Sequence, residues 1–433
     1  MGRESAGRGK ALGAKSEREQ AYIAAVGKLY ADFENTAQRV RLLAYRDAMH
    51  DVAGKYPDDH EAQIFYALAL AASEDPSDKT YASRLQAGAI LEKLFAVEPD
   101  HPGLAHYIIH AYDVPALADR ALVAARRYSV IAPDAPHALH MPSHIFARLG
   151  LWQDDIDSNL ASIVATRKTA AMHMGGESHQ FHAMDFLEYA YLQSGREADA
   201  RRLIDEIKAM PEMKDTMYGS DFDPRTYSLV VFSARYALEL HHWKDAASLP
   251  LVPGASPGDS VVTYWARAIG AARSGNQAEA RTDIAEIVRI RRMLVKQKKT
   301  EFVDYVDADR KEAEAWLAYA AGNHDQAEKT LRSIAEKQES EGDEPLAIPA
   351  REMLADMLAD MDQPGPALVE YEADLKFSPN RFDGLYGAAH AAELAGNHTE
   401  ANTYYAQLLK ICNGAASDRP ELSKAKALVA RNN

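Results

Sequence analysis

Residues 384–411 read GLYGAAHAAELAGNHTEANTYYAQLLKI, and this stretch decides the fold. Apolar side chains recur three and four residues apart on both sides of Gly396, which predicts two amphipathic helices joined by a short turn. Gly396 suits the left-handed backbone of a tight turn. Ala401, five residues later, is small enough to let two helix backbones approach each other closely. The stretch therefore predicts a helical hairpin.

The same pattern of turn glycine and packing alanine recurs along the chain. Gly is again followed five residues later by Ala in GREADA (195–200), GNQAEA (275–280) and GNHDQA (322–327). Four Pro-containing stretches each end one predicted helix and begin the next: KYPD (55–58), VEPD (97–100), IAPD (131–134) and FSPN (377–380). Since helical spacing dominates and no convincing alternating strand segment is found, the chain is predicted to be all-α.

With these marks the chain resembles the tetratricopeptide repeat family, whose unit is a 34-residue helix–turn–helix with Ala in the second helix and Pro near its end. The resemblance covers nearly all of residues 17–412. It implies a right-handed superhelical solenoid of helical hairpins with a long concave surface. We expect a disordered basic tail at 1–15, one solenoid at 16–413 with His-rich repeats at about 101–195, and a C-terminal helical tail at 414–433. Ser16 and Glu19 form a capping-box pattern at the first solenoid helix.

The composition narrows the range of partners. Asp and Glu number 64 against 49 Lys and Arg, and the formal charge of -15 opposes binding to nucleic acid or to anionic lipid. No run approaches the roughly 20 apolar residues that span a bilayer, so we expect a soluble protein without a membrane partner. The single cysteine, Cys412, excludes an intramolecular disulfide and a thiolate-rich metal site. Any metal must therefore bind nitrogen and oxygen ligands. The sequence indicates neither a compartment nor an oligomeric state.

Two histidine pairs stand in the same register. When VEPD and IAPD are aligned, His106 matches His140 and His110 matches His144, each at a separation of 34 residues. Within each helix the two histidines are four residues apart and share a face. Adjacent packed helices lie roughly 8 to 10 Å apart, a gap that imidazoles from opposite sides can span with a metal between them. The register predicts that four ring nitrogens converge.

The resemblance adds further candidates. In the tetratricopeptide repeat family the fifth and ninth positions of the first helix typically face the concave groove and contact ligands, and all four histidines fall at these positions. In the next unit the resemblance places His182 at the second position, Asp185 at the fifth and Tyr189 at the ninth. His179 lies one turn before His182, and His137 occupies the second position of its own unit.

Imidazole ligands without thiolates favour Zn or Cu, with Fe as a further option. The predicted ligands are His106, His110, His140, His144, His182 and Asp185, with His137, His179 and Tyr189 as additional candidates. Asp185 would bind the metal or orient an imidazole. One metal with an open position would activate water, and two metals would suit oxygen chemistry. HYIIH and HMPSH lack the Glu that follows the first His of zincins, so a peptidase is not expected.

Other interpretations of the histidines stay open. Duplication of a repeat could have copied one pair whose imidazoles are only hydrogen-bonded, and protonated histidines could grip an anionic ligand. For the whole chain, the alternative to a metal-binding solenoid is a non-catalytic scaffold that binds a peptide or protein in its groove. The repeat architecture favours the scaffold, and the histidine register favours the metal-binding solenoid. In either case we expect a small molecule or a peptide as the ligand in the concave groove. No other catalytic constellation competes with the metal site, since no G-x-S-x-G, P-loop or Rossmann motif is present. Enzymatic turnover at the metal is left undecided.

Overall fold

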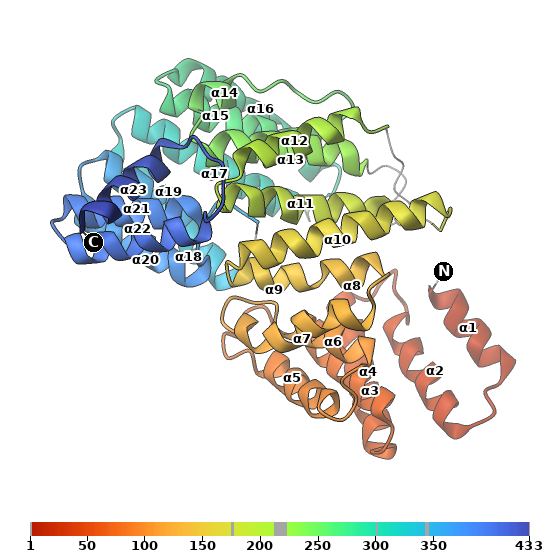
Figure 1. The fold of residues 1–433 in the computed structure, drawn as a ribbon. Helices are drawn as coiled ribbons and strands as arrows, with labels where there is room; N and C mark the ends of the chain where they lie inside the picture. Colours follow the sequence, from red (N-terminus) through yellow and green to blue (C-terminus); the bar gives the residue numbers. More distant parts are fainter. Residues whose placement is uncertain (1, 175–176, 212–222, 300–301, 343–345, 433) are drawn as a thin grey trace. The chain divides into compact units, whose positions relative to one another are not determined.

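The computed structural model describes residues 2–174, 177–211, 223–299, 302–342 and 346–432. These residues form α-helices with short connections and no strand (Figure 1). The predicted all-α class is confirmed, and the fold is a series of antiparallel helical hairpins. The chain forms two compact units, Met1–Pro133 and Asp134–Asn433, called unit 1 and unit 2 below. The single solenoid expected over residues 16–413 stays a prediction.

Unit 1 is built from consecutive helices that contact their neighbours in chain order. They are α1 (Gly2–Leu12), α2 (Glu17–Leu29), α3 (Gln38–Lys55), α4 (His60–Ala72), α5 (Ala82–Phe95), α6 (Pro102–Tyr112) and α7 (Ala118–Ile131). The capping box predicted at the start of α2 is present: Ser16 Oγ accepts from the backbone N–H of Glu19, and the Glu19 carboxylate accepts from the Ser16 N–H. These reciprocal bonds satisfy two backbone donors at the helix start.

The first residues differ from the expected disordered tail, because α1 is a helix. None of its side chains is buried, so it is held by surface contacts with the segment that follows. The Arg3 guanidinium lies over the ring of Phe33, 5.4 Å from its centroid. Gly2 lies so close to Tyr30, the residue that follows α2, that an added Cβ would overlap the Tyr30 ring. Small residues in α1 thus permit a close approach to α2 that the hydrophobic pattern does not reveal.

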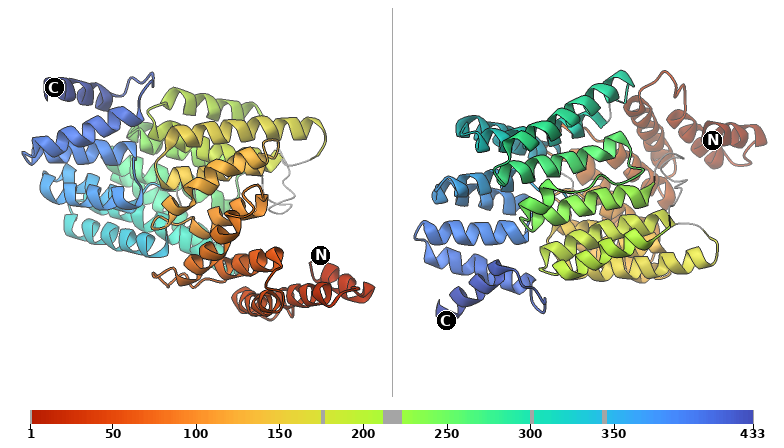
Figure 2. Two further views of the ribbon diagram at one scale, coloured as in Figure 1. Left: turned by 60° about the horizontal axis from the view of Figure 1, so that its bottom comes forward. Right: turned by 90° about the horizontal axis from the view of Figure 1, so that it is seen from above.

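Unit 2 continues the same antiparallel stacking, which Figure 2 shows from two further sides. Its helices are α8 (Pro136–His140), α9 (Pro142–Arg148), α10 (Trp152–Ala171), α11 (Glu177–Gln193), α12 (Glu197–Ala209), α13 (Pro224–Glu239), α14 (Trp243–Ala247), α15 (Pro257–Arg273), α16 (Gln277–Lys296), α17 (Val303–Ala320), α18 (His324–Glu341), α19 (Ala350–Asp360), α20 (Pro364–Phe377), α21 (Phe382–Leu394), α22 (His398–Ile411) and α23 (Pro420–Asn432). The predicted C-terminal helical tail corresponds to α23.

The Gly–Ala punctuation has the predicted geometry. The turn residues Gly195, Gly275, Gly322 and Gly396 all have positive φ, from 68° to 83°. The alanines that follow them, Ala200, Ala280, Ala327 and Ala401, are between 0 and 4% exposed. Each hairpin therefore depends on glycine for its left-handed turn and on alanine for the close packing of its second helix.

A closing contact within unit 2 joins the turn between α9 and α10 to the connection between α20 and α21. The indole N–H of Trp152 donates to the Asn380 carbonyl at 2.7 Å, and Asn380 Nδ2 donates to the Gly150 carbonyl at 3.2 Å. Gly150 has φ of +61°, and a Cβ built there would overlap the Pro379 carbonyl oxygen. Only glycine fits this position. The hairpins of unit 2 thus return on themselves.

The core of unit 2 is aliphatic and aromatic, and Trp152, Phe232 and Trp316 are each at most 4% exposed. Cys412 is a free, buried thiol. Among the described helices, none has the length and apolar character required to cross a membrane.

Candidate metal centre

Three helical segments of unit 2 present the central histidines. His140 ends α8 and His144 lies in α9, with Pro142 between them as the first residue of α9. Proline removes one helical N–H and so interrupts the hydrogen-bond ladder. Met141, however, keeps helical angles (φ -51°, ψ -33°), so the four-residue spacing still places both imidazoles on one face. His182 approaches from α11, which contacts α8 and α9.

The three imidazoles converge. One ring nitrogen from each of His140, His144 and His182 lies within 4.8 Å of the other two. The Nε2 atoms of His140 and His144 are 3.2 Å apart. In a tetrahedral zinc site with Zn–N bonds of about 2.0 to 2.1 Å, two ligand nitrogens lie about 3.3 Å apart. The separation in this pair therefore fits two ligands of one ion.

His140 is the best-fixed member of the triad. It is 3% exposed, and its Nδ1 lies 2.7 Å from Asn159 Oδ1. The Asn159 amide is oriented by its Nδ2, which donates to Asp155 Oδ1 at 2.6 Å and to the Asp155 carbonyl at 3.0 Å. Asn159 Oδ1 must then accept from His140 Nδ1–H, which assigns the tautomer and leaves the Nε2 lone pair directed at the triad. Asn159 and Asp155 are both fully buried.

The surroundings of His140 and His182 favour the neutral imidazole, the form that binds metal ions. Burial lowers the pKa of His140 well below its usual range, with smaller effects from His182 and His144. Burial, followed by His144, lowers the pKa of His182 to about 4. The Phe186 ring forms an apolar wall, with its centroid 5.0, 4.7 and 5.4 Å from those of His140, His144 and His182.

The other predicted pair lies in unit 1. His106 and His110 share one face of α6, as expected, with their Nε2 atoms 3.0 Å apart. His106 stacks on Tyr107 and Tyr128, with ring centroids at 5.3 and 5.4 Å. These two histidines therefore form a pair of their own within unit 1. Joint coordination with the histidines of unit 2 stays a prediction.

Asp185 and Tyr189 have other partners within unit 2. Asp185 Oδ1 accepts a hydrogen bond of 2.8 Å from Arg235 Nη1, and it is not one of the three converging groups. The same Arg235 nitrogen donates to Glu188 Oε2 at 2.8 Å. Tyr189 is 1% exposed and its hydroxyl accepts from Arg381. Of the candidates His182, Asp185 and Tyr189, which the resemblance placed in one repeat, only His182 belongs to the triad.

His137 and His179 extend the cluster along α8 and α11. Their ring centroids are 5.7 Å apart, one helical turn from His140 and His182 respectively. The structure thus pairs the two additional candidates with each other beside the triad.

The sequence interpretation missed the residues that support the triad. Asp155, Asn159, Ser162 and Thr166 form a buried polar stripe along α10 at spacings of three and four residues. A polar stripe at helical spacing is usually the solvent-facing side of an amphipathic helix. The pattern alone therefore gave no reason to assign these residues to the centre.

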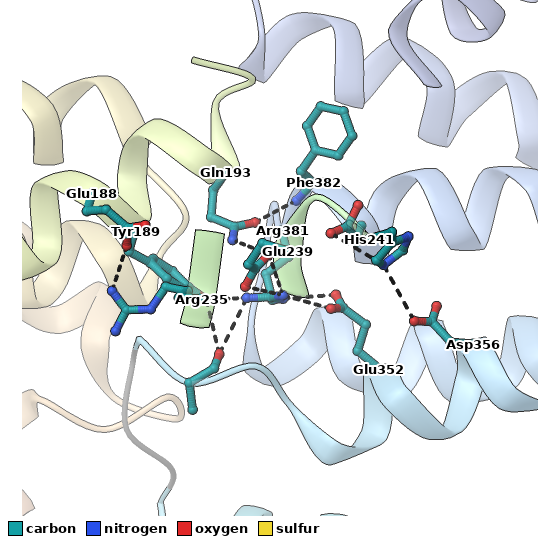
Figure 3. A network of polar contacts seen from close by, with 12 residues as sticks. Glu188, Tyr189, Gln193, Arg235, Glu239, His241, Glu352, Asp356, Arg381 and Phe382 are labelled. Atoms are coloured by element: carbon teal, nitrogen blue, oxygen red, sulfur yellow. Dashed lines mark hydrogen bonds and ion pairs between the residues drawn. The ribbon is translucent and has the colours of Figure 1, made fainter. Parts of the chain in front are cut away.

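A second polar cluster fills the interior of unit 2 (Figure 3). Arg381, which is 1% exposed, donates to Glu239 at 2.9 and 3.1 Å and to Glu352 at 2.9 and 2.7 Å. Gln193 donates to Glu239 at 2.9 Å and accepts from the Phe382 N–H at 2.9 Å. These groups come from α11, α13, α19 and the start of α21. Where the family resemblance implies an open concave groove, these side chains occupy the space between the four helices.

Comparison with known proteins gives structural likeness only. No family model matches the chain, and no curated protein matches it in sequence. A tetratricopeptide repeat protein from Parabacteroides merdae is 13% identical, with a TM-score of 0.33 over 68% of this chain and 97% of that one. The human IFIT1 dimer with m7Gppp-AAAA is 12% identical, with a TM-score of 0.38 over 95% of this chain and 86% of that one. Yeast Tom70 is 10% identical, with a TM-score of 0.36 over 96% of this chain and 97% of that one.

Proposed function

We propose that this chain is a helical-repeat binding protein whose unit 2 holds one transition-metal ion at His140, His144 and His182. The observation that carries the proposal is the convergence of three ring nitrogens within 4.8 Å. The hydrogen bond from His140 to Asn159 supports it, because metal-binding histidines usually donate their second ring N–H to an oxygen acceptor.

The ligand type favours zinc or copper, and iron is a weaker candidate. An ion held by three imidazoles keeps a coordination position for water or a ligand atom, and it lowers the pKa of water bound there. Enzymatic turnover depends on that open position. The chain's own contribution is to fix His140 through Asn159 and to exclude solvent on one side with Phe186.

The test is metal analysis of protein purified without chelator or metal-affinity tag. We expect about one equivalent of bound or tightly titrated Zn²⁺ or Cu²⁺, and loss of this uptake in His140→Ala/His144→Ala. The matched control is His324→Ala/His398→Ala, which removes two exposed histidines of unit 2 and should leave uptake unchanged. Less than about 0.2 equivalents with no tight uptake would refute the metal site.

A third double variant, His106→Ala/His110→Ala, tests the predicted joint coordination. If both pairs bind one ion, this variant weakens uptake as strongly as the loss of His140 and His144. If the triad binds alone, stoichiometry and affinity stay unchanged.

A scaffold function without metal is the second candidate, and the series of hairpins supports it. In that case His140 is a structural residue that is hydrogen-bonded to Asn159. The metal analysis separates the two functions, because a well-folded protein that takes up no metal is the outcome expected only for the scaffold. The buried Arg381 cluster argues against a peptide lying between α11 and α21.

A further inference from the structure

A partly open cavity of unit 2 lies beside the Arg381 cluster and includes none of the triad histidines. Its polar and aromatic lining is Glu239, His241, Trp243, Trp316, Glu352, Asp356 and Asp383. The space that the centre of a water-sized group can occupy measures about 20 Å³. That volume is enough for about one water molecule or one ammonium group.

His241 occupies a position where glycine is expected. It stands in the turn between α13 and α14, five residues before Ala246, as Gly195 precedes Ala200 and Gly275 precedes Ala280. Its φ is +53°, in the left-handed region that side chains other than glycine rarely adopt. The imidazole stacks on Trp243 with ring centroids 4.8 Å apart and planes at 20°. His241 thus has a strained backbone conformation, and its imidazole ring lines the cavity.

Two carboxylates face this imidazole across a short gap. His241 Nε2 lies 3.8 Å from Asp356 Oδ2 and 4.0 Å from Asp383 Oδ2, which is too far for direct hydrogen bonds. The second oxygens of both carboxylates have neighbours: Tyr371 donates to Asp356 Oδ1 at 2.5 Å, and Arg419 donates to Asp383 Oδ1 at 2.6 Å. The Oδ2 atoms and the imidazole therefore surround a space that suits a group with several N–H donors.

The charge around the cavity favours a cation. Four carboxylates line it, from Glu239, Glu352, Asp356 and Asp383. Arg381 pairs with the two glutamates and Arg419 with Asp383, so the formal negative charge exceeds the positive charge of these arginines by two, and by one when Glu352, whose pKa burial raises, is protonated. Arg273, which packs against Trp243 and Trp316, is paired with Asp360. An anionic ligand would be repelled.

A buried donor also points to a ligand. Trp316 is 2% exposed and lines the cavity, and its indole N–H has no hydrogen-bond partner among the residues that the structure describes. Buried donors are nearly always satisfied. The indole nitrogen itself is closed to water-sized groups, so a ligand reaches this N–H only after the cavity wall rearranges; a ligand that carries an oxygen acceptor beside its ammonium group would then satisfy it.

We propose that this cavity binds a primary ammonium compound that carries a nearby oxygen, with the ammonium group donating to Asp356, Asp383 and the His241 imidazole. A small amino alcohol and the amino terminus of a peptide share this chemistry. The site is independent of the proposed metal site, since no residue belongs to both.

The experiment is a titration of the whole chain with ethanolamine at constant ionic strength, followed through the tryptophan indole N–H signals in ¹H–¹⁵N NMR spectra. So small a ligand binds in the micromolar to millimolar range at best, so the titration extends to about 50 mM. We expect saturable shifts for Trp243 and Trp316. The N–H groups of Trp152 and Trp265 donate to Asn380 and Glu312 and should not shift.

Ethylene glycol, which lacks the charge, is the ligand control. Asp356→Asn should weaken ethanolamine binding at least tenfold. His241→Gly introduces the residue used at the other turns, so we expect a higher melting temperature together with tenfold weaker binding. Non-saturating shifts, equal shifts with ethylene glycol, or unchanged affinity in both variants would each overturn the proposal. Glycine amide and its N-acetylated form then distinguish a peptide terminus, which requires the free amine, from a free amino alcohol.

Discussion

Replacement of Arg381 by Met removes a cation that bonds two buried glutamates at once. Glu239 and Glu352 are 3 and 3% exposed and would be left without their shared guanidinium. A hydrogen bond to a charged group contributes about 1.5 to 3 kcal/mol. Counting one such interaction for each glutamate gives about 3 to 6 kcal/mol, which agrees with the 3 to 5 kcal/mol typical of a broken buried ion pair. We expect unit 2 to lose about 3 to 5 kcal/mol of unfolding free energy.

Tryptophan fluorescence during urea or guanidinium unfolding measures this loss. All four tryptophans, Trp152, Trp243, Trp265 and Trp316, lie in unit 2, so the signal reports that unit alone. Arg167→Met is the matched control, because it breaks an ion pair with Glu206 in which both side chains are about half exposed. Exposed pairs contribute about 0 to 1 kcal/mol.

The loss should also depend on pH. Burial raises the pKa of Glu352 well above its usual range, while Arg381 acts in the opposite direction. Without Arg381 the pKa rises further, and a carboxyl whose folded pKa is raised contributes stability that is lost as pH rises through that value. The difference between variant and wild type should therefore grow from pH 5 to pH 8. A loss below about 1 kcal/mol, or one that does not change with pH, would refute the account of Arg381 as the neutralising cation of this cluster.

Three further outcomes follow from the structure. Asn159→Ala should lower metal affinity about 10- to 100-fold at unchanged helicity, because it frees the His140 ring to rotate; equal affinity by competition with a metal indicator would contradict this. Burial raises the pKa of Glu188 to about 8, so unit 2 should lose stability as pH rises from about 4.3 through 8, and Glu188→Gln should flatten that dependence in urea titrations. Gly150→Ala should destabilise unit 2 by about 2 kcal/mol more than Gly275→Ala, since both strain a positive φ but only Gly150 abuts Pro379; equal thermal unfolding would contradict the packing argument.

The local part of the fold was accessible from the sequence. The Gly–Ala marks predicted the hairpins because a left-handed turn and a tight helix contact each require one residue type. The four-residue spacing predicted that His140 and His144 share a helix face, and the family resemblance added His182 from the next repeat; a ring nitrogen of each lies within 4.8 Å of the other two. Asp185 was assigned by the same counting, but Arg235, 50 residues later, lies close enough to bond it. Counting within one helix cannot detect such a partner.

The long-range part was not accessible. The contact of Arg381 with Tyr189 joins residues 192 positions apart. Whether such residues meet depends on small rotations between successive hairpins, which add up along the array and leave no periodic signal. The division into two units at Pro133 likewise leaves no periodic signal in the sequence. The stretch from 129 to 137 looks like any other helix-ending segment in this chain.

The closing contact between Trp152, Gly150 and Asn380 constrains how this protein can change during evolution. Arrays of repeats commonly gain or lose a unit by duplication or deletion, because each unit contacts only its neighbours. In unit 2 an added hairpin would move Asn380 away from Trp152 and Gly150, and would separate Arg381 from Glu239. The number of hairpins between α10 and α21 is therefore fixed by geometry, and variation in this segment should occur by substitution and in loop length.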